Sequence, residues 1–126
     1  MALPGWLERR YERPRIGVFG CGCQHYWEQF PGLRERLIAH QERFEARLRQ
    51  EGVDVVSGGL VDSSQQAFLT GDSFRRQGIQ FLFCYMSTYA PSSTVLPIVQ
   101  RAGVPMVVIS LQPHRAMDYE RATTFM

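Results

Sequence analysis

Polar and aromatic residues follow two of the most apolar stretches of this sequence, and their side chains could bind a small polar ligand. Residues 24–27 (Gln-His-Tyr-Trp) follow the apolar run 16–19, and residues 87–93 (Ser-Thr-Tyr-Ala-Pro-Ser-Ser) follow the apolar run 79–86. The amide of Gln24 can donate to one sugar hydroxyl and accept from another. Aromatic rings pack on the C–H faces of sugars. The open alternative is that Tyr and Trp pack on the sheet and the His bonds a backbone carbonyl.

Nucleophilic and metal chemistry are weaker interpretations of the same segments. Cys21 or Cys23 would need an activating base to become a nucleophile, and His25 is close in sequence only. His25 and His114, with Asp118, would make a poor metal set because a carboxylate-rich cluster is lacking. We therefore predict neither a catalytic residue nor a metal ligand in this chain.

The residues at the strand ends argue against a nucleotide-binding domain and against a response regulator. The glycines of 17–22 do not have G-x-G-x-x-G spacing, and Pro31 interrupts the approach to the next helix. Residues 57–59 (Ser-Gly-Gly) stand where a ribose-binding acid would be expected. The sequence contains no Lys, which excludes a Walker A motif and the lysine of response regulators.

Composition is that of one ordinary globular domain. The chain has 126 residues, 44% of them hydrophobic, and a net charge of +2, which is too small to indicate nucleic acid as a partner. We find no signal peptide and no apolar run long enough to span a membrane. Three cysteines, an odd number, argue against a disulfide framework and favour a reducing compartment, so we expect a cytoplasmic protein.

Hydrophobic periodicity predicts alternating strands and helices. The expected strands are 15–20, 53–56, 79–85 and 105–111, and the expected helices are 33–50, 62–76 and 92–101. Right-handed crossovers then give an α/β, three-layer α-β-α fold, Rossmann-like or flavodoxin-like, with a parallel sheet of strand order 2-1-3-4. Residues 1–14 are a lead-in, and 15–126 form a single domain. This order places the two ligand-binding candidates at one edge of the sheet, where Gln24 and Tyr89 are expected to share a cleft.

Two details of the helices are left for the structure. Gly71 lies inside the second helix and leaves open a division into two short helices, while Asp62 or Ser63 is a plausible N-cap. His40 falls on the charged face of the first helix, so we expect it to be solvated. Gly52 is expected to cap the C-terminus of that helix.

These segments resemble the N-terminal domain of the L-arabinose isomerase and L-fucose isomerase superfamily. Residues 22–27 are similar to the Gly-Ser-Gln-His-Leu-Tyr segment of arabinose isomerases, with Gly, Gln and His matching in kind. Residues 88–91 (Thr-Tyr-Ala-Pro) resemble the family's Thr-Phe-Ser-Pro segment, and residues 104–113 resemble the stretch around its fourth strand. The departures are Cys23, Tyr26 and Trp27, and the change to Tyr26 bears on the choice of sugar.

The resemblance implies the N-terminal region of an aldose–ketose isomerase that needs a divalent metal, usually manganese. In that family the catalytic carboxylates and metal ligands lie in later domains, so this chain would bind no cofactor itself. By motif match, the residues that would contribute to a sugar pocket are Gln24, His25, Tyr26 and Tyr89. In the family, this pocket belongs to a neighbouring subunit. The alternative is a non-catalytic sugar-binding or assembly module that works with a partner chain. An exposed fourth strand would favour a homo-oligomer or a partner domain.

Overall fold

The computed structural model of the protein describes residues 13–112, 114–116 and 120. Most of the predicted lead-in 1–14, and Asp118, lie outside these residues. The strands are β1 (Arg15–Cys21), β2 (Asp54–Val61), β3 (Phe81–Met86) and β4 (Met106–Ile109). The helices are α2 (His25–Gln29), α3 (Leu33–Gln50), α4 (Ser64–Arg76), the 3₁₀ helix η2 (Ser92–Thr94) and α5 (Leu96–Ala102).

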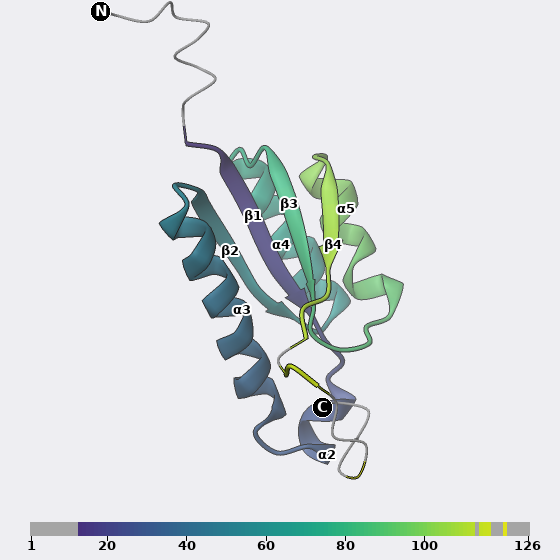
Figure 1. The fold of residues 1–126 in the computed structure, drawn as a ribbon. Coiled ribbons are helices and arrows are strands. Elements are labelled where there is room, and N and C mark those ends of the chain that lie inside the picture. Colours follow the sequence, from purple (N-terminus) through teal and green to yellow (C-terminus); the bar gives the residue numbers. More distant parts are fainter. Residues whose placement is uncertain (1–12, 113, 117–119, 121–126) are drawn as a thin grey trace, which may run out of the picture.

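The four strands form one parallel sheet with the order β2-β1-β3-β4, which confirms the predicted topology. Helix α3 lies on one face of the sheet and α4 and α5 lie on the other, so the fold has three layers (Figure 1). The carboxyl ends of all the strands point to the same edge. The segments that follow β1 and β3 therefore leave the sheet beside each other, because β1 and β3 are neighbours.

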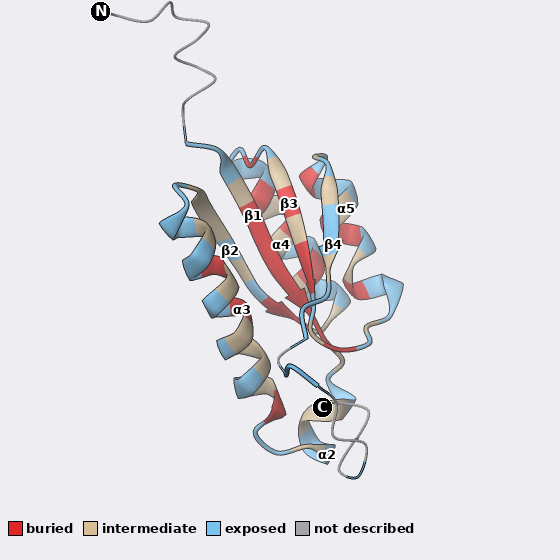
Figure 2. Cartoon of the chain, in the orientation of Figure 1, coloured by how far each residue is buried: buried red, intermediate tan, exposed pale blue. Residues whose placement is uncertain are grey.

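The face covered by α4 and α5 carries the main hydrophobic core. Phe19 of β1 lies 6.4 Å, centroid to centroid, from Phe74 of α4, and both rings are almost fully buried. Leu82 of β3 and Ile98 of α5 continue the same cluster with no exposed surface. The buried residues lie along the two central strands and the inner sides of these helices (Figure 2).

The opposite face is covered less completely. Phe44 of α3 packs edge-on against Phe83 at 5.4 Å and lies 5.9 Å from Tyr85, so α3 reaches across β1 to β3. On this face, Val107 of the edge strand β4 is the partner of Phe83 in the sheet and is 43% exposed. One half of this face is thus packed, and the half near β4 is open among the described residues.

Strand β2 is longer than predicted because its pairing with β1 resumes after the two glycines. We expected it to end at Val56, but it continues to Val61. Its pairing with β1 shifts between Val18 and Gly20, which is a β-bulge, and Gly59 there has a φ of +68°. A glycine adopts this conformation at little cost, so the Gly-Gly pair bends the strand and does not end it.

Helix α4 is a single helix, and Gly71 explains its close contact with α5. A Cβ atom at Gly71 would lie 3.0 Å from the carbonyl oxygen of Pro97 and 3.1 Å from Cα of Ile98. The glycine therefore permits two helix backbones to approach and does not break the helix. Ser63 is the N-cap, because its hydroxyl accepts from the backbone N–H of Gln66 at 3.2 Å.

The other differences from prediction lie at element ends. Helix α3 has the predicted bounds, and Gly52 follows it with a φ of +88°. The segment after β1 contains the short helix α2, which we had expected to be a loop. The predicted third helix is divided into η2 and α5, with Pro97 in the first turn of α5. Strand β3 begins two residues later than predicted and ends one residue later, at Met86, and β4 is shorter than predicted at both ends.

Candidate functional site

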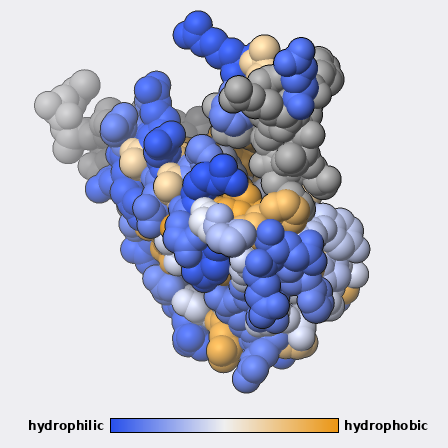
Figure 3. Space-filling model, turned by 90° about the horizontal axis from the view of Figure 1, so that it is seen from below, coloured by the Kyte–Doolittle hydropathy of each residue, from blue (hydrophilic) through white to orange (hydrophobic). Residues whose placement is uncertain are grey.

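A cavity of about 710 Å³ lies at the carboxyl ends of the strands, on the α3 side of the sheet. Its walls come from four places: α2, the N-terminal half of α3, the end of β3 with the loop 87–89, and the segment after β4. A cavity of this size suits a small organic ligand. Seen from this edge, apolar side chains show in the middle of a largely hydrophilic surface (Figure 3).

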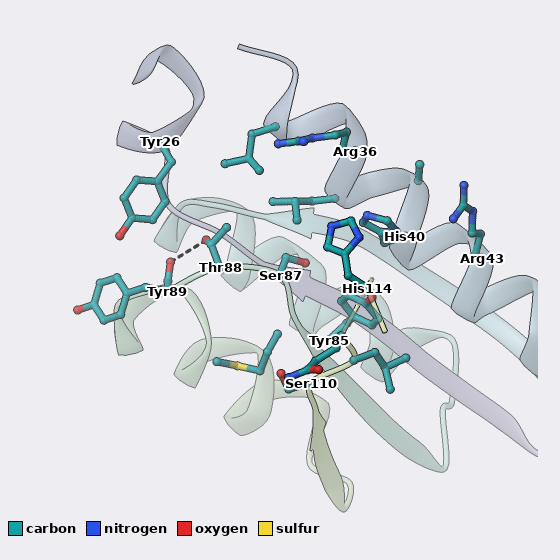
Figure 4. Close-up of a pocket in the computed structure, with 16 residues that line it drawn as sticks. Tyr26, Arg36, His40, Arg43, Tyr85, Ser87, Thr88, Tyr89, Ser110 and His114 are labelled. Atoms are coloured by element: carbon teal, nitrogen blue, oxygen red, sulfur yellow. Dashed lines mark hydrogen bonds between the residues drawn. The ribbon is translucent and has the colours of Figure 1, made fainter. Parts of the chain in front are cut away.

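Two of the four predicted ligand residues line this cavity. Tyr26 of α2 and Tyr89 of the loop after β3 both contribute to its wall, and the Tyr89 side chain is among the most exposed apolar groups, at 67%. Both rings lie at one end of the group of lining residues (Figure 4). The Thr88 hydroxyl donates to the carbonyl oxygen of Tyr89 at 2.9 Å, which fixes the backbone beside that ring.

Gln24 and His25 are not among the lining residues, so the expected shared cleft for Gln24 and Tyr89 is corrected. The Gln24 amide donates to Asp62 at 3.4 Å, and the indole N–H of Trp27 donates to the same carboxylate at 2.9 Å. Asp62 at the end of β2 thus ties down the start of α2, a contact between segments 35 residues apart. His25 is exposed. Trp27 therefore has a structural contact, and the Gln24 side chain points toward the end of β2.

Two buried polar atoms near the end of β1 have no hydrogen-bond partner among the described residues. They are Oγ of Ser87, which lines the cavity, and Oε1 of Gln41, whose side chain is 3% exposed. Both atoms lie beside Gly20, where a Cβ atom would overlap Oε1 of Gln41 and lie 3.0 Å from Oγ of Ser87. Unpartnered buried polar atoms are costly, so this point favours a water or a ligand hydroxyl.

The Gln41 side chain is held in place by a polar network under α3. Its amide donates to a carboxylate oxygen of Glu45 and to the carbonyl oxygen of Gly59, both at 3.1 Å. Ser57 of β2 donates to the same Glu45 oxygen at 2.6 Å. Glu45 is 4% exposed and has no ion pair within the described residues. The bulge in β2 is what presents Gly59 to this network.

Basic side chains line the α3 wall, and sequence analysis had missed them. Arg36, His40 and Arg43 follow one another at spacings of four and three residues on α3, which places them on one side of the helix. His114, from the segment after β4, lines the cavity opposite them (Figure 4). We expected His40 to be solvated, and it is partly exposed while it also lines the cavity.

The basic groups around His40 affect its pKa. Burial lowers the pKa of His40, and the positive charges of Arg43, Arg36 and His114 lower it further. Tyr85, also in the cavity wall, has a pKa raised by burial, so its hydroxyl stays protonated and can donate a hydrogen bond. The spacing of these basic residues around Leu33 and Leu37 was the sequence signal that could have revealed them.

The cysteines do not form a substrate-accessible nucleophile. Cys21 and Cys84 face each other on β1 and β3 and are each 1% exposed. A hydrogen bond from Cys84 lowers the pKa of Cys21 to about 7, while the same pairing and burial raise the pKa of Cys84. All three cysteines, Cys23 included, are free thiols. The buried pair packs in the sheet, where the Cys21 thiol can donate weakly to the carbonyl oxygens of Tyr85 and Thr88, at 3.9 and 3.8 Å.

The part of the chain that the structure describes contains no cluster of side chains suited to hold a metal ion. No three His, Cys, Asp or Glu side chains gather there at ligand distances. His114 lies near His40 and in the cavity wall, whereas His25 does not line it. The proposed completing residue, Asp118, is outside the described residues.

Comparison with known proteins does not assign the chain to a family. No family model matches the chain, and no curated protein matches it significantly. Among the described helices, none has both the length and the apolar character needed to cross a membrane.

Proposed function

We propose that this chain binds a small sugar, or a similarly polyhydroxylated molecule, in the cavity at the carboxyl ends of its strands. The observation that carries the proposal is the composition of the cavity: two tyrosine rings at one end and the unpartnered hydroxyl of Ser87 in its wall. Aromatic rings contact the C–H faces of a sugar, and a buried hydroxyl without a partner favours a ligand hydroxyl. Tyr85 adds a protonated donor.

On the resemblance stated above, the chain would be the N-terminal region of an L-arabinose- or L-fucose-type isomerase. Tyr26 and Tyr89 would contact the sugar, while the exposed Gln24 and His25 would reach the pocket of a neighbouring subunit. Enediol chemistry needs a base and an electrophile, and none of the lining residues that the structure describes is a carboxylate. The catalytic carboxylates and the manganese would therefore come from elsewhere in the protein. Three free thiols favour a cytoplasmic location.

Calorimetric titration of the purified chain with L-arabinose and with L-fucose tests sugar binding. We expect saturable binding of one of them, weakened about tenfold or more by Tyr89→Ala, which removes a ring contact. Ser87→Ala should also weaken binding, whereas Phe68→Ala, on the outer side of α4, should not. Absence of saturable binding to either sugar would overturn the proposal.

A separate assay tests the division of labour between binding and catalysis. The chain incubated with manganese and either sugar should form no ketose, because the cavity wall supplies no carboxylate pair. Turnover that survives repurification and disappears on Tyr26→Ala would show that the chain is itself catalytic.

Assembly with a second copy is a further proposal, and the open side of the sheet favours it. Among the described strands, β4 lies at the edge of the sheet with no partner on its outer side, and Val107 and Val108 are about half exposed. Edge strands of this kind pair readily with another chain. We expect sedimentation to show a dimer whose population falls in Val108→Lys. A wild-type chain that is monomeric at all concentrations would rule this out.

A further inference from the structure

The wall of the cavity formed by α3 has a strong excess of positive charge. Arg36 and Arg43 carry positive charges on α3, with the imidazole of His40 between them, and the imidazole of His114 joins them from the segment after β4. None of the described lining residues is acidic. The cavity therefore concentrates positive potential on one wall, although the chain as a whole has a net charge of only +2.

Within the described part of the chain, no ion pair neutralises these charges. The described ion pairs of the protein join Arg15 to Asp54, Arg47 to Glu51, and Arg101 to Asp72, and none includes Arg36 or Arg43. The carboxylates of α3 that are exposed, Glu35 and Glu42, do not line the cavity. Four like-charged or chargeable groups that face one space repel one another, and an anion placed among them would remove that repulsion.

The arrangement of the lining residues also separates two ends of the cavity. Tyr26 and Tyr89 lie at one end of the group and Arg43 at the other, with His40 and His114 between them (Figure 4). A ligand with a hydroxylated body and a charged terminal group has the matching distribution of chemistry. Guanidinium groups bind carboxylate and phosphate oxygens with two parallel hydrogen bonds.

We propose that the natural ligand of this cavity is an acidic sugar derivative, a sugar phosphate or a sugar carboxylate. Its anionic group would lie among Arg36, His40, Arg43 and His114, and its hydroxylated part would lie toward Tyr26 and Tyr89. This inference rests on the proposed sugar-binding function and narrows its ligand class.

The test is a calorimetric titration of the full chain with four probes at one ionic strength. The probes are D-arabinose, D-arabinose 5-phosphate, D-arabinonate and inorganic phosphate. We expect at least one of the two acidic sugars to bind about tenfold or more tightly than D-arabinose, since charge-assisted hydrogen bonds contribute more than neutral ones. Which acidic sugar binds more tightly distinguishes a phosphate group from a carboxylate.

Variants of α3 locate the anion. Arg36→Gln and Arg43→Gln should each lower the affinity for the acidic sugar much more than the affinity for D-arabinose. Arg49→Gln is the matched control, because Arg49 is exposed on the same helix and does not line the cavity. Added salt should weaken the acidic sugar more than the neutral one.

Each result decides between the two proposals. Equal affinity for D-arabinose and both acidic sugars would overturn the acidic ligand and leave sugar binding intact, as would an equal loss in Arg49→Gln. Binding of inorganic phosphate as tight as that of the sugar phosphate would support the anion site and count against the sugar part. No binding of any probe, together with none of L-arabinose or L-fucose, would overturn both.

Discussion

The two faces of the sheet are built differently, although the same strands form both. The α4–α5 face is closed by two helices and contains Phe19, Phe74, Leu82 and Ile98 with almost no exposed surface. The α3 face is packed only over β2, β1 and part of β3, and its contacts include a buried carboxylate network and a cavity. Close packing of apolar side chains favours stability, and it leaves no room for a ligand.

The difference suggests that stability and ligand binding are separated across the sheet. Residues of the closed face can be changed only at a high cost in folding free energy, while the open face carries polar and charged groups that hydrophobic packing alone would not select. Unpartnered polar atoms near the end of β1 are consistent with this division, because they reduce stability and favour a bound group.

The largest expected changes in the free energy of unfolding come from truncating one aromatic ring on each face of the sheet. Phe74→Ala should lower the free energy of unfolding by about 3–5 kcal/mol, because the ring is 1% exposed and leaves a cavity in the closed core. Phe44→Ala should cost less, about 2 kcal/mol, since this ring is partly exposed beside the open half. Urea unfolding of both variants measures the difference. Equal losses would show that the two faces contribute equally.

The contact between α4 and α5 provides a second test on the closed face. Gly71→Ala should destabilise the protein by about 1–2 kcal/mol, although alanine normally favours a helix, because the new methyl group would press on the α5 backbone. Thermal unfolding measures the change. Gln65→Ala, at an exposed position of α4, is the control and should be neutral or slightly stabilising. A more stable Gly71→Ala variant would contradict the tight packing.

The polar network under α3 is the corresponding test on the other face. Ser57→Ala removes a 2.6 Å hydrogen bond to the Glu45 carboxylate and should cost about 1–2 kcal/mol. The bond is only partly buried, which keeps the effect below that of the core rings. Ser64→Ala, at an exposed position outside the network, is the matched control in urea unfolding. No loss in Ser57→Ala would show that water replaces the hydroxyl.

The smallest expected effect concerns the pH dependence of stability. The pKa of His40 is lowered in the folded protein by burial and by Arg43, Arg36 and His114, so the unfolded chain binds a proton more readily. Stability should therefore fall as pH decreases through the usual histidine pKa, from about pH 7 to about pH 5. His40→Gln should make this slope shallower in urea unfolding at the two pH values. An unchanged slope would show that His40 does not feel these charges.

The strand order and the bounds of α3 could be predicted from the sequence because both depend on regular local patterns. Apolar runs of strand length, helical spacing of Leu33, Leu37 and Phe44, and the handedness of crossovers leave few other topologies. The errors fall where a local signal had a tertiary cause. Gly71 was weighed as a helix breaker and is a helix–helix contact, and Gly59 marks a bulge within β2. Neither role can be seen without the partner element.

The candidate site was only partly predictable for the same reason. The sequence by itself determined that polar and aromatic segments leave β1 and β3 at one edge, which places Tyr26 and Tyr89 in the cavity wall. Only the tertiary structure decided that Gln24 turns to Asp62, and that basic residues on one side of α3 line a cavity. A helix rotation and a side-chain direction depend on contacts between residues far apart in the chain, and periodicity carries no information about those contacts.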